Sequence, residues 1–121
     1  SANVAASQKL TQLLDDAGMC PRAALWVHES DTSSWRLWIV PAKDITDKRE
    51  FYRRIVEVIS GHREQLSGLE ASDTEFVSDA HPAIQGLKRI IRVEGTSSVR
   101  FSNNVFNGFF LPEAIIIRMA L

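Results

Sequence analysis

The stretch RAALWVHESDTSSWRLWIV, residues 22–40, decides the fold that the sequence predicts. Residues 23–29 and 35–40 are rich in aromatic and β-branched side chains, which favour strands. The segment SDTSS between them is typical of a polar turn. We therefore expect an antiparallel hairpin over these residues.

A turn over residues 30–34 would pair Trp26 with Trp38 and His28 with Arg36. One face of this hairpin is then aliphatic and suited to the core: Leu25, Val27, Leu37 and Ile39. The other face combines large aromatic side chains with polar ones: Trp26, His28, Arg36 and Trp38. Trp and Arg are enriched in protein interfaces, so this second face is a candidate interface or ligand surface.

A competing interpretation assigns the two tryptophans to an ordinary core. Under that interpretation the helix expected over residues 4–17, or the C-terminal strands, would cover Trp26 and Trp38. His28 would face a like charge if it were protonated beside Arg36, which favours a neutral, structural imidazole.

Three segments have the apolar spacing of helices. Residues 4–17 end before Gly18, which is typical of a helix C-terminus. The segment from Asp47 carries Glu50 three residues later, a pattern that predicts a capping box. The segment HPAIQGLKRIIR, residues 81–92, places Pro82 at the first helical position. The stripe of this third helix that we expect to be buried is Ala83, Leu87, Ile90 and Ile91.

The remaining strands are a short one over TEFVS, residues 74–78, and a closing hairpin whose turn we place at Pro112-Glu113. In this register Asn107 pairs with Arg118, which is a candidate for binding an anion or a carboxylate; a salt bridge is the simpler role. Both faces of the hairpin are apolar near its turn. Such a strand is either central in its sheet or covered by another chain.

These elements predict the order αββαβαββ. Strands that come in pairs, separated by helices, favour an α+β fold with a mainly antiparallel sheet of about five strands. We expect the helices to pack on one face of this sheet. A length of 121 residues without a linker-like segment fits a single domain over residues 1–121.

Composition narrows the partners that we expect. The formal net charge is -1, and Glu residues interleave with the Lys and Arg residues of residues 47–66, so nucleic-acid binding is not favoured. The apolar runs are too short to span a bilayer, and we expect no membrane association. Cys20 is the only cysteine, which suits a reducing compartment and predicts a cytoplasmic location.

No motif in the chain names a reaction. Phosphate-loop, dinucleotide-binding, zincin and hydrolase-elbow patterns are all missing from the sequence. Cys20 and the scattered histidines make neither a nucleophile pair nor a set of metal ligands with close spacing. We therefore predict no metal and no cofactor, and an enzyme is not favoured.

The segments NGFFLPEAIIIRM, REFYRRI and SVRFS resemble a group of small bacterial α+β proteins that have no assigned activity. The resemblance covers about residues 21–118. It implies a bacterial origin and brings no catalytic residue with it.

Two functions remain. The first is a non-catalytic interaction module, homodimeric or joined to another protein, that uses the Trp26/Trp38 face or the last hairpin. The second is a ligand-binding or enzymatic domain with a polar pocket between helices and sheet. The candidate residues of that pocket are His81, Arg100, Asn103, Asn104 and Arg118.

Overall fold

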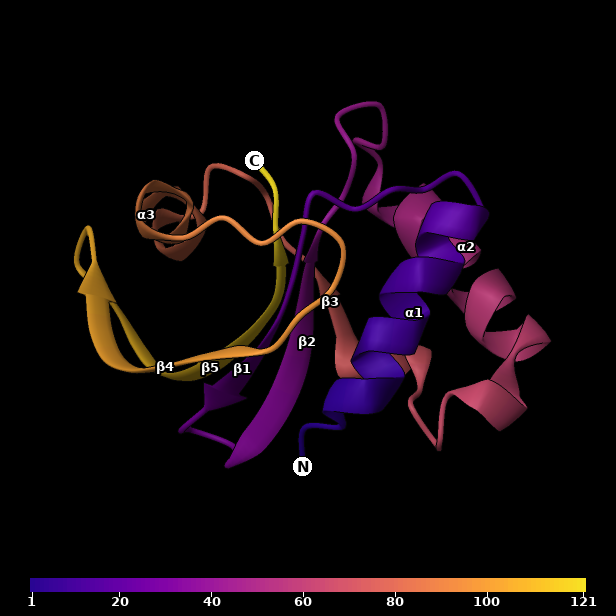
Figure 1. Cartoon of the computed structure of the whole chain (residues 1–121), viewed down its shortest axis with the longest axis horizontal. Coiled ribbons are helices and arrows are strands. Elements are labelled where there is room, and N and C mark those ends of the chain that lie inside the picture. Colours follow the sequence, from indigo (N-terminus) through magenta and orange to yellow (C-terminus); the bar gives the residue numbers. More distant parts are fainter.

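The structure is a computed structural model that describes all 121 residues (Figure 1). Its helices and strands, in chain order, are α1 (Val4–Asp16), β1 (Ala23–Glu29), β2 (Ser34–Val40), α2 (Lys48–Gly61), β3 (Thr74–Phe76), α3 (Pro82–Ile90), β4 (Val99–Phe106) and β5 (Phe109–Met119). Two short 3₁₀ helices, η1 (Arg63–Gln65) and η2 (Ala71–Asp73), lie between α2 and β3. The expected order αββαβαββ did not include these two turns.

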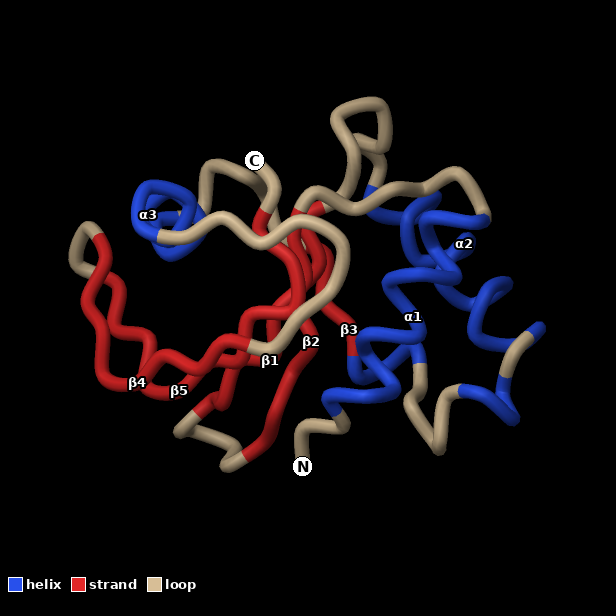
Figure 2. The backbone as a smooth tube through the Cα atoms, in the orientation of Figure 1, coloured by secondary structure: helices blue, strands red, loops and turns tan.

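The strands form one open five-stranded sheet in the order β3-β2-β1-β5-β4 (Figure 2). All neighbouring strands are antiparallel except β3, which runs parallel to β2. The α+β class and the number of strands are confirmed, but the sheet is mixed. The parallel pair arises because α2 forms a crossover connection between β2 and β3, as parallel neighbours require.

Helices cover both faces of the sheet, so the expectation that they pack on one face is wrong. On one face α1 and α2 cover a cluster that includes Ala24, Trp26 and Ile115, and on the other α3 covers Leu25 and Val27 (Figure 1). The physical reason lies in β1, whose successive residues are all apolar from Ala23 to Val27 and therefore need cover on both sides.

The register of the β1–β2 hairpin differs by one residue from the predicted one. Ser34 belongs to β2 and pairs with Glu29, so the loop has four residues, 30–33, and Trp26 lies opposite Leu37. A shift of one residue moves every side chain to the other face. Trp26 consequently lies under α1, and Trp38 lies on the α3 side with Leu25. The predicted face that joins Trp26, His28, Arg36 and Trp38 does not exist.

The turn of the last hairpin lies at Asn107-Gly108 rather than at Pro112-Glu113. Both turn residues have positive φ angles, 49° and 83°, as a two-residue type I′ hairpin turn requires. Pro112 lies inside β5, between its pairs with β4 at Leu111 and Glu113. The Asn-Gly pair is the stronger hairpin signal in the sequence, and the predicted turn did not take it into account.

The helix boundaries agree closely with the sequence. Asp47 caps α2 by accepting a hydrogen bond from the amide of Arg49 at 3.0 Å, whereas Glu50 binds Arg53 and does not complete a capping box. In α3 the buried stripe is Ala83, Ile84 and Leu87, and Ile90 is 58% exposed because the helix ends there. None of the helices combines the length and the apolar character needed to cross a membrane.

Candidate functional site

A cleft opens at the end of the sheet where β1 and β5 separate. Their last paired residues are His28 and Glu113; beyond them the β1–β2 loop and the β4–β5 hairpin diverge. The cleft has a volume of about 360 Å³. Its lining consists of Val27, His28, Glu29, Ser30, Asp31, Thr32, Trp38, Phe109, Phe110 and Pro112.

The divergence has a local cause in β4 and β5. Pro112 has no amide proton to donate to a neighbouring strand. Opposite it, between the pairs Ser102–Glu113 and Asn104–Leu111, Asn103 has a φ angle of 55°, which interrupts the extended backbone of β4 without changing the register. Beyond this interruption the hairpin curls toward α3 instead of continuing beside β1 (Figure 1).

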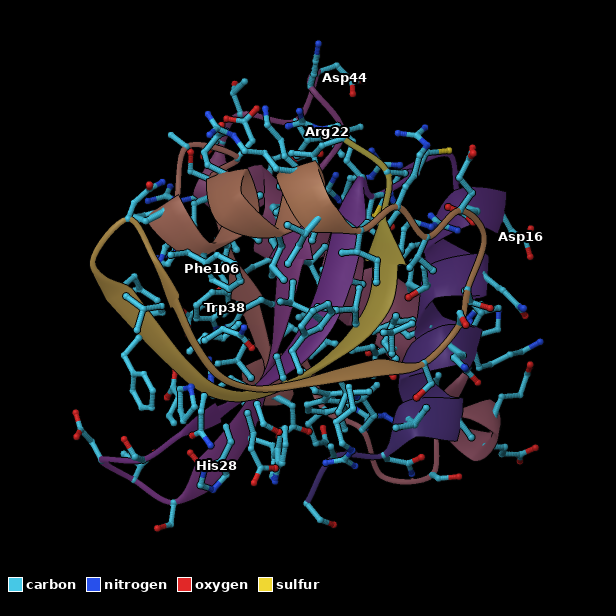
Figure 3. The ribbon with its side chains drawn as sticks, turned by 60° about the vertical axis from the view of Figure 1, so that its left-hand side comes forward. Asp16, Arg22, His28, Trp38, Asp44 and Phe106 are labelled. Atoms are coloured by element: carbon cyan, nitrogen blue, oxygen red, sulfur yellow. The ribbon has the colours of Figure 1, made fainter.

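Trp38 contributes to the cleft from the core on the α3 side. It is only 4% exposed, and its indole Nε1–H has no hydrogen-bond acceptor. Its ring makes an edge contact with the ring of His81 and a tilted contact with the ring of Phe109, at centroid distances of 4.9 and 6.1 Å. Figure 3 shows Trp38 and Phe106 inside the curl of the hairpin, beneath α3.

His81, the N-cap residue of α3, packs against both Trp38 and Phe109. Its Nδ1 accepts a hydrogen bond from the amide of Ala83 at 3.1 Å, so a neutral ring carries its proton on Nε2. Burial lowers the pKa of His81, and the negative charge of Glu75 opposes that effect. The neutral imidazole is therefore the form that packs against Trp38 and Phe109.

The rim of the cleft is acidic. Glu29 and Asp31 line it, and neither carboxylate takes part in a salt bridge. The lining contains no Lys or Arg. His28 lies beside the β1–β2 loop (Figure 3). It pairs with Trp35 and not with Arg36 as predicted, and the centroids of the His28 and Trp35 rings are 5.1 Å apart in an edge contact.

The convex side of the β4–β5 hairpin carries an exposed apolar pair. Val105 and Phe110 face each other across the strands and are 64% and 52% exposed. Phe106 and Phe109, the next pair toward the turn, pack instead into the core on the α3 side. Phe110 also lines the cleft, so the two surfaces adjoin.

The other candidate residues from the sequence lie apart from the cleft. Trp26 donates its indole N–H to Ser7 Oγ at 2.9 Å, and Arg36 binds Glu75 and two backbone carbonyls. Arg118 does not meet Asn107, which forms the hairpin turn.

Instead, both terminal nitrogens of Arg118 bind the Asp15 carboxylate at 2.7 and 2.8 Å, while the carbonyls of Gly95 and Pro21 accept its remaining bonds. The Asp15 carboxylate raises the pKa of Arg118. Arg118 in β5 therefore forms a salt bridge to Asp15 in α1, the simpler of the two roles considered from the sequence.

The weaker pocket candidates do not converge on one pocket. Arg100 lies 3.5 Å from Glu113 on the exposed side of the hairpin, and Asn103 lies opposite Pro112, beside Asn104. His81 belongs to the core cluster against Trp38. The sequence reasoning had passed over Glu29, Asp31 and Phe109; the Asn-Gly turn was the signal that would have brought Phe109 to this end of the sheet.

A second cleft, of about 300 Å³, lies at the carboxyl ends of the parallel strands β2 and β3. This is a common place for ligands in sheets with parallel strands. Its best-placed cation, Arg22, is already engaged by Asp79 at 3.0 Å and by the carbonyl of Pro41 at 2.7 Å. The cleft at the hairpin ends is therefore the stronger candidate, because Trp38 Nε1–H and the carboxylates of Glu29 and Asp31 have no partners there.

The structure contains no group of His, Cys, Asp and Glu side chains that could hold a metal ion. No protein-family model, curated protein or solved structure matches the chain. The candidate site thus rests on its own geometry.

Proposed function

We propose that this chain is a non-catalytic protein-interaction module that forms a homodimer through the convex side of the β4–β5 hairpin. The observation that supports the proposal is the cross-strand pair Val105 and Phe110, two of the four large apolar side chains that are exposed. A cytoplasmic location belongs to the same proposal, because the free, exposed thiol of Cys20 suits a reducing compartment.

A second copy fits this surface because the surface is self-complementary. Apolar Val105 and Phe110 lie on the same side as the opposite charges of Arg100 and Glu113. A twofold axis near the apolar pair would bury it against its own copy and let Arg100 of each subunit approach Glu113 of the other. Symmetric dimers use such isologous contacts.

The test is the mass in solution by sedimentation equilibrium. We expect the wild type to be a dimer at micromolar concentration, and Val105→Ser and Phe110→Ser each to raise the dissociation constant about tenfold or more. Val56→Ser is the matched control, since Val56 is 49% exposed on α2, and it should leave the mass unchanged. Circular dichroism checks that each variant folds, and a wild type that is monomeric at high micromolar concentration refutes the dimer.

The second candidate function is a ligand-binding domain. The observation that favours it is the buried Trp38 Nε1–H, which has no acceptor and belongs to a side chain lining an open cleft.

A further inference from the structure

The indole N–H groups of the two buried tryptophans differ in their hydrogen bonding. Trp26 is 2% exposed and donates to Ser7 Oγ, whereas Trp38 is 4% exposed and donates to nothing. A buried donor without an acceptor destabilises a fold, so native proteins rarely leave one. An oxygen brought by a ligand would satisfy Trp38, because this side chain lines the cleft.

The rim of the cleft selects for positive charge. Glu29 and Asp31 both line it and have no cationic partner in the chain. An anionic ligand would meet like charge here, while a Lys or Arg side chain would find unpaired carboxylates.

Parts of β1 and β5 that border the cleft have a neighbouring strand on one side only. Beyond His28, β1 is paired only with β2, and before Glu113, β5 is paired only with β4. Glu29 of β1 and residues 109–112 of β5 therefore have no strand partner on the side of the cleft. Such edges bind extended peptides through main-chain hydrogen bonds.

We propose that the cleft between the β1–β2 loop and the β4–β5 hairpin binds an extended peptide segment that carries a Lys or Arg side chain. A main-chain carbonyl of the peptide accepts the hydrogen bond of Trp38 Nε1–H, and the cationic side chain lies against Glu29 and Asp31. Entry of the carbonyl requires the half-buried ring of Phe109 to move aside, since this ring covers Trp38 from the hairpin.

The size of the cleft limits the ligand. A volume of about 360 Å³ lies at the lower end of the range of small-ligand sites, so it accommodates one long side chain and the adjoining main chain. Phe110 belongs both to this cleft and to the proposed dimer surface, but Val105 does not line the cleft, so a Val105 variant tests the dimer without changing the cleft.

The test follows the indole N–H signals in ¹H–¹⁵N NMR spectra. The probes are acetyl-Gly-Arg-Gly-amide and, as the control of opposite charge, acetyl-Gly-Glu-Gly-amide; Trp38→Phe assigns the Trp38 signal. We expect the Arg probe to shift the Trp38 Nε1–H signal in a saturable way and the Glu probe to have no effect. The signal of Trp26 should stay fixed, because its donor is already bound on the other face of the sheet.

Two variants separate the contributions. Glu29→Gln combined with Asp31→Asn should weaken binding of the Arg probe about fivefold, as loss of two exposed ion pairs predicts. Val105→Ser should bind the probe like the wild type, whatever its mass in solution. The proposal is overturned if the Arg probe at about 10 mM leaves the Trp38 signal unmoved, because the dissociation constant would then be well above about 10 mM. Equal shifts from both probes, or undiminished binding to the double variant, overturn it as well.

Discussion

The two faces of the sheet are covered in different ways. On the α1–α2 face two long helices close the core, and its buried polar groups are paired: Trp26 with Ser7, and Arg118 at the edge with Asp15. On the α3 face the cover is a nine-residue helix and a curled hairpin, and Trp38 Nε1–H stays unpaired. The closed face provides stability, and the face with an incomplete cover provides the candidate site.

A close contact between α3 and the hairpin involves a glycine. A Cβ atom at Gly86 would lie 2.3 Å from Phe106 Cδ1, so the ring rests directly on the helix backbone. The hairpin curl therefore depends on a missing side chain in α3.

The largest effect that we expect compares the two indoles. Trp26→Phe should lower the free energy of unfolding by about 3 kcal/mol, because it creates a void and deprives buried Ser7 of a partner. Trp38→Phe should cost only about 1 kcal/mol, because it also removes an unpaired donor. Urea denaturation measures both values, and equal losses would contradict the difference between the two faces.

A pair of glycines tests the hairpin curl. Gly86→Ala should destabilise by about 2 kcal/mol, because the new methyl group forces Phe106 and the hairpin away from α3. Gly61→Ala, at the end of α2 where a Cβ meets nothing within 4 Å, should stabilise by about 0.5 kcal/mol. Thermal unfolding measures both changes: the melting temperature should fall in the Gly86 variant and rise in the Gly61 variant. A neutral Gly86→Ala would show that the hairpin is not held by this contact.

The cap of α2 gives a smaller effect on the closed face. Asp47→Ala should lower the free energy of unfolding by about 1 kcal/mol, since the amide of Arg49 loses its acceptor. Asp44→Ala is the control: this aspartate is exposed in the preceding loop and forms no salt bridge. If both variants have the denaturation midpoint of the wild type, the cap contributes nothing.

The smallest effect is a pH dependence on the α3 face. Burial lowers the pKa of His81, so the unfolded chain takes up its proton at a higher pH than the folded one does. Stability from this group is complete above the unfolded pKa of about 6.5 and is lost as the pH falls through the folded pKa. His81→Asn keeps an acceptor for the Ala83 amide and should lose less stability between pH 7 and pH 5 than the wild type. Identical losses in thermal unfolding would contradict a role for His81.

Much of the fold was predictable because its helix signals are local. The aspartate at position 47, Pro82 and the apolar spacing each specify a helix within a few residues, and the structure has those helices. The register of β1 and β2 was not predictable in this way. It depends on whether Ser34 belongs to the loop or to the strand, and a polar residue fits both.

The candidate site depended on that same register. Trp38 and His28 were identified as residues of interest, and both line the cleft. The prediction that Trp26 and Arg36 are their neighbours was wrong, because a shift of the pairing register by one residue moves side chains to the opposite face of the sheet. Phe109 and Phe110 reach the cleft through the Asn107-Gly108 turn, which the sequence does signal, and through the positive φ angle of Asn103, which no local pattern specifies.

The position of β5 between β1 and β4 has a consequence for folding. The centre of the sheet joins a strand near one end of the chain to a strand near the other, as in the pair Leu25–Ile116. Closing so long a loop is slow, and β1 keeps one apolar edge open until β5 arrives. During synthesis the β1–β2 hairpin must therefore wait until residues 109–119 have been added, and in that interval its open edge is exposed to aggregation.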